Sequence, residues 1–274
     1  MKIFLKITKW VILGFFLFVT LYPIIWLILA SFKSSNLELQ TNSFGFPEKW
    51  MFINYYNAIT KAKLLSLFAN SIIVAGFAVA LNLVIAAMAS FVLSREEFKG
   101  RDLIHTVIVA GILLPIISFM VPYFSIIQKL HLYDSLLALI LVYSTINIPI
   151  SVFLVSSFMG TIPKELEEAA TMDGASFYQR FSKVILPLSQ TGLATAGTFC
   201  FIYAWNEFIM ALLLTSSETS RTLQLGIRFF TSQFVTDYTA MYAAIVITII
   251  PSIVVYILFH NKIISGLTAG AVKG

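Results

Sequence analysis

Polar side chains are scarce in this chain, and two groups of them could do chemistry. The first group is a run of acids and small residues from Glu165 to Gly174, between two apolar stretches. The second is Trp205-Asn206-Glu207, inside an apolar stretch. Aromatic faces can stack on sugar rings, and amide or carboxylate groups can bind hydroxyls. The second group could therefore line a cavity that binds a solute.

The chain offers little for catalysis or metal binding. Cys200 is the only cysteine, and His105, His131 and His260 stand apart from one another. No segment matches a Gly-rich phosphate loop ending in Gly-Lys-Ser/Thr, and the sequence contains no His-Glu-x-x-His. We therefore expect no metal site, no cofactor and no ATP hydrolysis in this chain, and we expect it not to be an enzyme.

The elements that hold these residues are membrane spans. Of 274 residues, 59% are hydrophobic and only 11% are charged, and the mean hydropathy is +0.90. Soluble domains carry about 25% charged residues. The net charge of +5 fits lysines and arginines that flank spans. Membrane lipid is thus an expected partner and nucleic acid is not.

Six charge-poor windows are long enough to cross a hydrocarbon core of roughly 30 Å as helices. They are 10–32, 64–94, 103–128, 135–163, 184–206 and 238–261. The sequence predicts an all-α membrane protein of six transmembrane helices, with the fifth continuing past Glu207 to about Leu214. Kinks are expected at the prolines inside spans, which are Pro115, Pro122, Pro149 and Pro251.

The spans divide the chain into three parts: residues 1–66 with the first span and an outer loop, a core over 67–262, and a tail over 263–274. The first apolar run is longer than the roughly 7–15 residues of a secretory signal, so it is expected to stay as a span. Lys2, Lys6 and Lys9, with the basic cluster of 95–101, favour a cytoplasmic N-terminus. The C-terminus and the loop 159–190 are then cytoplasmic too.

Two outer loops are long, at roughly 33–66 and 215–239. The first is rich in aromatic residues, including Phe44, Phe46 and Trp50. Such residues suit either an aromatic belt at the membrane interface or a docking surface for an extracellular partner. Both interpretations stay open at this point.

Glu207 lies within a predicted span. A charge at mid-membrane costs about 2.5–3.5 kcal/mol on insertion scales, so this carboxylate should face protein or water. It could line a translocation path with Trp205 and Asn206, lie hydrated near the outer end of its span, or tether neighbouring helices. Asn82 and Asn147 are expected to hydrogen-bond between helices rather than to bind a ligand.

The loop 159–190 carries helix signals at both ends of a first helix. Pro163 suits a first turn, and the acids from Glu165 to Glu168 favour the positive end of a helix dipole. Gly174 suits a left-handed C-terminal cap. The pattern predicts a short helix that ends at this glycine.

A second short helix is predicted from about Ser176 to Leu186, with Pro187 opening the fifth span. The result is a helix–turn–helix projection whose small residues, Ala169 and Ala170, let it enter a cleft on another protein. An amphipathic segment lying on the membrane is the alternative. Three acids in one turn are disfavoured beside anionic lipid, which favours the projection.

The spacing in this loop is specific: Glu168-Ala169-Ala170, three residues, Gly174, nine residues, Val184, one residue, then Leu186-Pro187. It resembles the cytoplasmic signature of the membrane subunits of bacterial ATP-binding-cassette (ABC) importers, with Val184 in place of the usual isoleucine. The resemblance implies the type I ABC importer transmembrane fold. It also implies that the loop between spans four and five is a coupling helix, seated in a groove of an ATPase subunit.

The resemblance further implies the assembly and its location. The partners would be a second homologous permease subunit, two ATPase subunits that carry the ATP and magnesium, and an extracellular solute-binding protein, in a bacterial cell membrane. Glu168 would pair with a basic residue of the ATPase groove. The residues implied in coupling are Glu167, Glu168, Ala169, Ala170, Asp173, Gly174, Leu186 and Pro187.

Three further features resemble the carbohydrate branch of the family, of the type of the smaller permease subunit of the maltose transporter. They are Tyr203–Phe208 followed by Ala211–Ser216 in the fifth span, Arg221–Leu223 in the next loop, and the final segment Gly266–Gly274. This implies import of a sugar or oligosaccharide. In that type the loop between spans five and six reaches the binding protein, and the tail reaches the ATPase dimer. The tail residues implied in that contact are Gly270, Val272, Lys273 and Gly274.

Other functions stay open. The coupling signature is shared with importers of non-sugar solutes. An ion-driven secondary transporter would need inverted repeats and intramembrane acids in both halves, whereas this chain has one such acid, Glu207. A membrane-embedded enzyme would need a nucleophile–base or metal constellation, and the sequence shows none.

Overall fold

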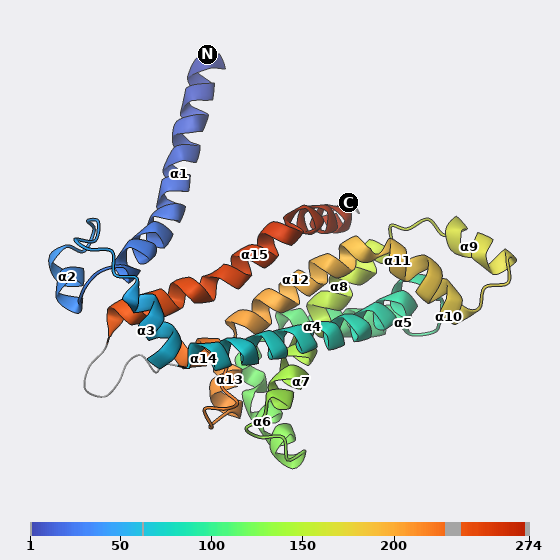
Figure 1. The fold of residues 1–274 in the computed structure, drawn as a ribbon. Coiled ribbons are helices and arrows are strands. Elements are labelled where there is room, and N and C mark those ends of the chain that lie inside the picture. The colour runs from blue at the N-terminus through green and yellow to red at the C-terminus, as the bar shows by residue number, and fades with distance from the viewer. Residues whose placement is uncertain (1, 62, 228–236, 272–274) are drawn as a thin grey trace. The chain divides into compact units, whose positions relative to one another are not determined.

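The computed structural model describes residues 2–61, 63–227 and 237–271, and all regular elements in these ranges are helical (Figure 1). The chain forms two compact units. The first comprises residues 1–66 with 226–250, and the second comprises residues 67–225 with 251–274. The division into a first span with its loop, a core and a tail remains a prediction.

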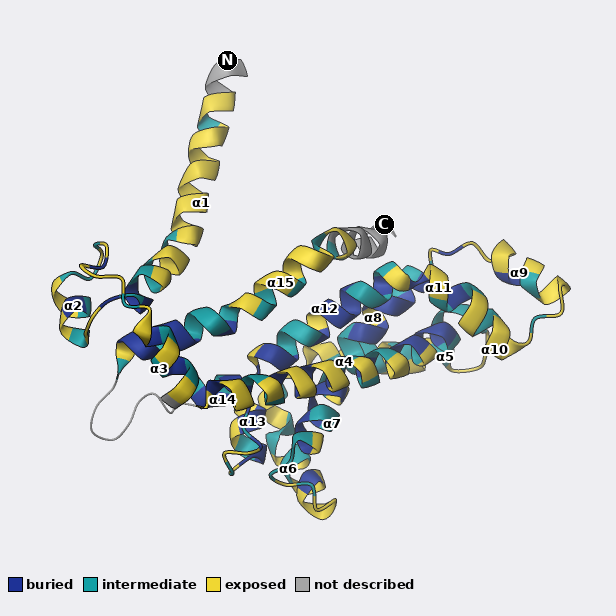
Figure 2. Ribbon diagram, viewed as in Figure 1, coloured by how far each residue is buried: buried dark blue, intermediate teal, exposed yellow. Residues whose placement is uncertain are grey.

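The first unit contains a long apolar helix. Its elements are α1 (Lys2–Ser31), α2 (Asn36–Thr41), α3 (Ile53–Lys61) and the first part of α15 (Tyr238–Ala271). Figure 2 shows α1 exposed along most of its length, and its exposed side chains include Trp10 at 64% and Phe18 at 64%. A helix that is apolar on all sides and exposed is stable in lipid rather than in water.

The predicted outer loop 33–66 is an ordered cap beyond α1. The Asn54 side-chain amide donates to the carbonyl oxygens of Ser31 at 2.9 Å and Lys33 at 2.8 Å. The buried Lys33 ammonium donates to the carbonyl oxygen of Asn42. In the same loop Phe44 and Phe46 are 77% and 74% exposed. Exposed rings on an ordered frame suit an interfacial belt and a docking surface equally.

The second unit holds the remaining spans. Its elements up to Lys129 are α4 (Leu64–Arg95), α5 (Arg101–Ala110), η1 (Gly111–Leu113), η2 (Ile116–Phe119) and α6 (Met120–Lys129). They continue with α7 (Leu136–Ile146), α8 (Ile148–Met159), α9 (Glu165–Met172), α10 (Phe177–Gln179), η3 (Arg180–Ile185) and α11 (Leu186–Leu188). The last are α12 (Gln190–Asn206), α13 (Ile209–Leu214), α14 (Leu223–Ile227) and the end of α15.

The helical character of the six predicted windows is confirmed, but three of them are bent. Within the described residues, three helices are long and apolar enough to cross a membrane, at Lys6–Ser31, Leu64–Arg95 and Tyr238–Ile263. Three further pairs of consecutive helices are long and apolar enough to cross a membrane when each pair is taken as one span. The two helices of a pair meet at an angle: 104° after Leu113, 47° after Ile146 and 74° after Leu188. The count is six where each bent pair is one span.

Proline explains the sharpest bend. Pro115 has no N–H to give a helix and disfavours helical geometry in the residue before it. Leu114 and Pro115 are both extended, with ψ of 126° and 127°. Pro149 lies in the first turn of α8, just after the second bend. Pro251, by contrast, stays inside α15.

The prediction that the fifth span continues past Glu207 is wrong. Helix α12 ends at Asn206, Glu207 is extended with ψ of 131°, and α13 begins anew at Ile209. The Glu207 carboxylate accepts hydrogen bonds from the amides of Met210 at 2.7 Å and Ala211 at 3.0 Å. A carboxylate that binds these amides caps the new helix and stops the old one.

Helix α8 packs against both α5 and α12, and Figure 2 shows much of α8 and α12 buried. The Asn82 amide donates to Ser144 O at 2.8 Å and accepts from the Ser151 hydroxyl at 2.7 Å, which confirms its helix–helix role. Asn147 instead donates to Tyr143 O one turn back, so the same expectation for it is wrong. Its position at the break between α7 and α8 leaves that carbonyl without a helical partner.

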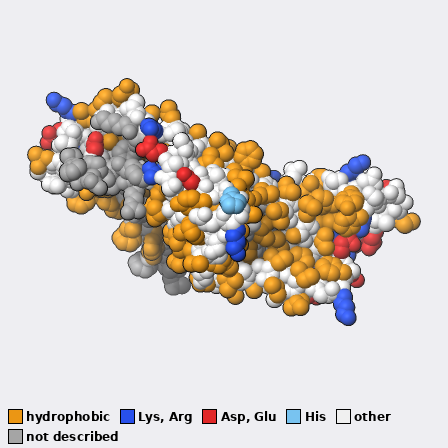
Figure 3. All heavy atoms as spheres, turned by 90° about the horizontal axis from the view of Figure 1, so that it is seen from below, with side chains coloured by type: hydrophobic (Ala, Val, Ile, Leu, Met, Phe, Trp, Pro, Cys, Tyr) orange, Lys and Arg blue, Asp and Glu red, His pale blue; other side chains and the backbone are white. Residues whose placement is uncertain are grey.

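Hydrophobic side chains are spread over the face seen in Figure 3, whereas acidic and basic side chains lie together in a few small groups. Several of the most exposed apolar residues of the second unit lie on the bent pair that contains Pro115. They are Leu113 at 83%, Val121 at 74% and Leu103 at 69%. Apolar exposure of this extent suits a surface covered by lipid or by another membrane subunit.

Candidate functional site

The loop 159–190 folds as the predicted helix–turn–helix projection. Helix α9 ends at Met172, and Gly174 takes φ of +84° in the left-handed region, as the sequence predicts. The Gly174 amide donates to Thr171 O at 3.0 Å and the Ala175 amide to Ala170 O at 2.9 Å. This pair of bonds is the Schellman motif, which closes the end of a helix.

The second helix of the projection begins with a capping box. The Ser176 hydroxyl accepts from the Gln179 amide, and the Gln179 side chain accepts from the Ser176 amide at 2.8 Å. The helical path then runs through α10, η3 and α11 to Leu188, so it extends past the predicted end at Leu186. Pro187 lies in α11 and is exposed, and the main span resumes at Gln190 after the bend. Pro187 therefore precedes the bend rather than opening α12.

Two neighbouring acids of α9 differ in their exposure and contacts. Glu167 is 7% exposed, and its carboxylate accepts from the Arg95 guanidinium at the end of α4. The same carboxylate lies 3.6 Å from the Arg180 guanidinium. Glu168 is exposed. Glu167 thus holds α9 to its own chain, whereas Glu168 is available to a partner.

Arg95 also binds the end of α8. Its Nη1 donates to the carbonyl oxygens of Ile162 at 2.8 Å and Met159 at 3.2 Å. The last carbonyls of a helix lack helical partners, and a cation stabilises them. Arg180 in turn donates to Glu96 at 2.9 Å. Two arginines and two glutamates therefore join α4, α8, α9 and η3, and we call this group the arginine clamp.

Aromatic rings also join α4 to the projection, in addition to the arginine clamp. The Phe91 ring of α4 lies 5.2 Å, between centroids, from the rings of both Phe177 and Phe181. Ile185 is fully buried in the same cluster, with Met159 and Val155. Leu186 is half-buried beside it. The projection is thus fixed at its base by both charge and packing.

The outward surface of α9 mixes acidic, small and apolar residues. Met172 is 88% exposed and Leu166 is 44% exposed, while Ala169 and Asp173 are also exposed. A hollow of ≈ 470 Å³ lies beside this surface, lined by Arg95, Lys164, Glu167, Glu168, Thr171, Met172 and Arg180. We call the exposed residues Leu166, Glu168, Ala169, Met172 and Asp173 the α9 face. An exposed methionine among small residues suits contact with another protein.

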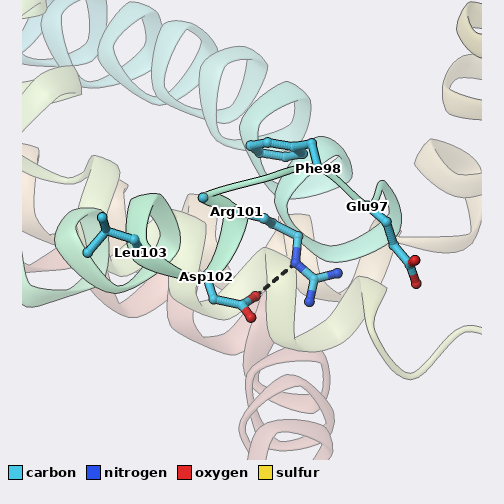
Figure 4. Close-up of a pocket in the computed structure, with 6 residues that line it drawn as sticks. Glu97, Phe98, Arg101, Asp102 and Leu103 are labelled. Carbon is cyan, nitrogen blue, oxygen red and sulfur yellow. Dashed lines mark hydrogen bonds and ion pairs between the residues drawn. The ribbon is translucent and has the colours of Figure 1, made fainter.

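A smaller hollow of ≈ 290 Å³ lies in the neighbouring loop between α4 and α5. Figure 4 shows Arg101 turned toward Asp102 and Glu97 pointing away from both. The Arg101 Nε donates a hydrogen bond to Asp102 Oδ1 at 2.8 Å. Glu97 lies 3.9 Å from Lys164, which precedes α9. This exposed pair adds little free energy, because solvent screens it.

The structure separates the three residues proposed to line a path. Trp205 is 1% exposed and packs against Phe68 and Phe201, with centroids at 5.4 and 5.7 Å. Asn206 is exposed, and its oxygen accepts from Gln224 at 3.4 Å. Glu207 is 9% exposed, and Tyr143 of α7 donates to it at 2.7 Å. Glu207 therefore joins α7 to α13, as the tether interpretation expects.

The predicted tail contact lies only partly within the described residues, and two arginines of the site were not predicted from the sequence. Gly270 lies in α15, while Val272, Lys273 and Gly274 lie outside the described residues. In the sequence, Arg95 is one of several basic residues that indicate orientation, and no pattern in the sequence indicates the contact of Arg180. A basic residue that ends a long apolar helix, beside a loop with unpaired acids, is the signal that could have identified the Arg95 contact.

Apolar spans, three of them bent, with a polar projection between the fourth and the fifth, point to a membrane permease subunit of an ABC importer. The chain belongs to the family of binding-protein-dependent transport system inner membrane components, whose model matches residues 82–263. It is therefore a multi-pass protein of the inner membrane and a transport component, not an enzyme.

Similar proteins include permeases named for sugars. The chain is 35% identical to the diacetylchitobiose uptake system permease protein NgcG of Streptomyces coelicolor, over 93% of this chain and 85% of that one. It is also 35% identical to the trehalose/maltose transport system permease protein MalG of Thermococcus litoralis, over 93% and 92%. A chain of a bacterial ABC transporter that imports the acidic polysaccharide alginate matches with a TM-score of 0.83 and 27% identity, over 95% and 96%.

Proposed function

We propose that this chain is one permease half of an ATP-driven importer of a sugar or oligosaccharide. It pairs with a second homologous permease subunit, two ATPase subunits that hold the ATP and magnesium, and an extracellular solute-binding protein. Membership of the family and the sugar-named relatives support this assignment. Both termini and the projection are cytoplasmic in this proposal.

The observation that carries the proposal is that the α9 face is exposed, while the buried side of the same helix is attached to the spans by the arginine clamp. The arginine clamp ties α9 to the ends of α4 and α8. A force applied to the α9 face therefore moves those spans, rather than bending the loop alone. Closure of an ATPase dimer on ATP would apply such a force and switch the side from which the path is open.

The cargo is tested by ATP hydrolysis of the whole importer. The complex is purified from its native membrane, reconstituted in lipid, and supplied with its binding protein and with maltose, trehalose or diacetylchitobiose in turn. We expect at least one of these sugars to stimulate hydrolysis severalfold over the binding protein alone. Stimulation by an amino acid or an inorganic anion instead would remove the sugar assignment and leave the ABC permease class intact.

The tail is tested separately. In this proposal Gly270, Val272, Lys273 and Gly274 contact the ATPase dimer. A chain truncated after residue 269 should insert and assemble but show weaker stimulation of hydrolysis. Full stimulation by the truncated chain would remove the tail from the coupling machinery.

A further inference from the structure

An open hollow that the coupling machinery does not use lies at the bends of two spans. Its volume is ≈ 320 Å³, at the small end of the about 300–1,000 Å³ typical of ligand pockets. The lining includes Phe119 and Tyr123 from the first bent pair, Thr145 and Asn147 from the second, and Tyr203 from α12. Three different spans therefore meet at one cavity.

The hollow lies at the centre of those spans. The first bent pair runs from Arg101 to Lys129 and breaks after Leu113, while the second runs from Leu136 to Met159 and breaks after Ile146. Both breaks are close to the midpoint of their span. Irregular backbone at this membrane depth is tolerated where it is buried in protein or lines a water-filled cavity.

The polar groups of the hollow are uncharged. Tyr123 and Thr145 hydroxyl oxygens lie 3.1 Å apart and link the two bent pairs across the rim. The Asn147 amide nitrogen donates to Tyr143 O. None of the described residues that line the hollow carries a charge. Such a lining does not compensate an ion or a zwitterion.

Aromatic rings supply the rest of the surface. Phe119 and Tyr123 lie next to each other, with centroids 6.2 Å apart, and Tyr203 packs edge-on against Tyr143 at 6.1 Å. Ring faces bind the apolar faces of sugar rings, and hydroxyl and amide groups bind sugar hydroxyls. Broken helices at mid-membrane also line the solute sites of other transporters.

We infer that this hollow is a binding subsite for one uncharged sugar unit of the cargo, so that this subunit contacts the solute directly during transport. The inference rests on the proposed function. It places the contact at Tyr123, Thr145, Asn147 and Tyr203, and not at Trp205, which is buried among other rings.

The test is protection of an introduced thiol. The natural Cys200 is buried and is replaced by Cys200→Ala. In that background Thr145→Cys places a thiol at the rim of the hollow, on the second bent pair. Ser118→Cys places one on the first bent pair, at an exposed position outside the lining. The reconstituted importer is trapped with a non-hydrolysable ATP analogue and binding protein, with and without the stimulating sugar. Alkylation by a small hydrophilic methanethiosulfonate is then timed.

We expect sugar to slow alkylation of the Thr145→Cys variant at least fivefold and to leave the Ser118→Cys variant within twofold. Equal rates with and without sugar at Thr145→Cys, in a complex whose ATP hydrolysis the sugar stimulates, would overturn the subsite and leave the importer assignment standing. An importer that no sugar stimulates would overturn both. Equal slowing at both positions would assign the protection to a change of conformation and overturn the subsite.

Discussion

Two loops of the second unit are fixed by acidic residues, but by different chemistry. In the projection, Glu167 meets two guanidinium groups, Arg95 and Arg180. In the loop between α6 and α7, Asp134 meets amides and a hydroxyl of the loop after α13: Ser216 N at 2.8 Å, Ser217 N at 3.0 Å and the Ser220 Oγ. The first loop is held by paired charges and the second by dipoles.

The two kinds of contact suit different mechanical roles for the two loops. A buried ion pair is costly to break, since each partner is left as an uncompensated charge, so it suits a joint that transmits force. A carboxylate bound by several amides lets one loop hold another without a matching cation. The clamp thus makes α9 part of the spans, whereas Asp134 joins two connecting loops to each other.

Removing Arg95 should have the largest effect. Arg95→Ala leaves Glu167 buried beside one remaining arginine and frees the carbonyls at the end of α8, at a cost of about 3–5 kcal/mol. We expect little assembled complex, measured by co-purification with the ATPase subunits. Lys164→Ala is the matched control, because its pair with Glu97 is exposed. Assembly of the Arg95→Ala complex at the control's level would show that the clamp is dispensable.

Next in size is the loss of the Glu207 cap. Glu207→Ala leaves the amides of Met210 and Ala211 and the Tyr143 hydroxyl without their acceptor, at about 1–3 kcal/mol. Thermal unfolding of the detergent-solubilised complex should shift down by several degrees. Glu207→Gln retains an acceptor and should fall between wild type and Glu207→Ala. A Glu207→Ala complex that unfolds with the wild type would contradict the tether role.

Asp134 should show a smaller, local effect that depends on pH. Burial acts to raise the pKa of this carboxyl, but hydrogen bonds from Ser220, Ser216 and Ser217 outweigh it and hold the pKa well below its usual value. Because the folded pKa is depressed, the stabilisation is complete above about pH 4, the unfolded value, and is lost as pH falls through the folded pKa.

Hydrogen exchange of the amides of Ser216 and Ser217 measures this effect. After correction for intrinsic rates, protection in the wild type should be constant from pH 7 to pH 5. Asp134→Asn should lower it roughly fivefold for each bond lost, over that whole range. Wild-type protection that already declines between pH 7 and pH 5 would contradict the depressed pKa.

Gly174→Ala should have the smallest effect on stability. Nothing lies within 4 Å of the position that an added Cβ would take, so the cost is only that of the left-handed backbone, about 1–2 kcal/mol. We expect normal assembly with a modest loss of coupling, and a smaller loss for Gly174→Asn, since asparagine tolerates this region. A Gly174→Ala loss as large as that of Arg95→Ala would point to a direct contact at Gly174 instead of a turn.

The helical spans, the turn at Gly174 and the family were accessible from the sequence, because each rests on local signals: apolar length, a glycine at a helix end, and residue spacing. The direction of Glu167 was not accessible. It depends on Arg95, which lies 72 residues away and meets α9 only after α4 and α8 have packed. The burial of Trp205 and the tether at Glu207 likewise depend on Phe68 and Tyr143, which belong to other spans.

The α9 face is tested most directly by reversing one exposed charge. ATP hydrolysis stimulated by binding protein and sugar is measured in reconstituted importers that carry Glu168→Lys, with Glu165→Lys as the control from the same exposed turn. The account predicts at least a tenfold loss of stimulation for Glu168→Lys in a complex that still assembles, and near wild-type stimulation for Glu165→Lys. Wild-type stimulation in the Glu168→Lys importer would contradict the claim that the α9 face receives the force of the ATPase.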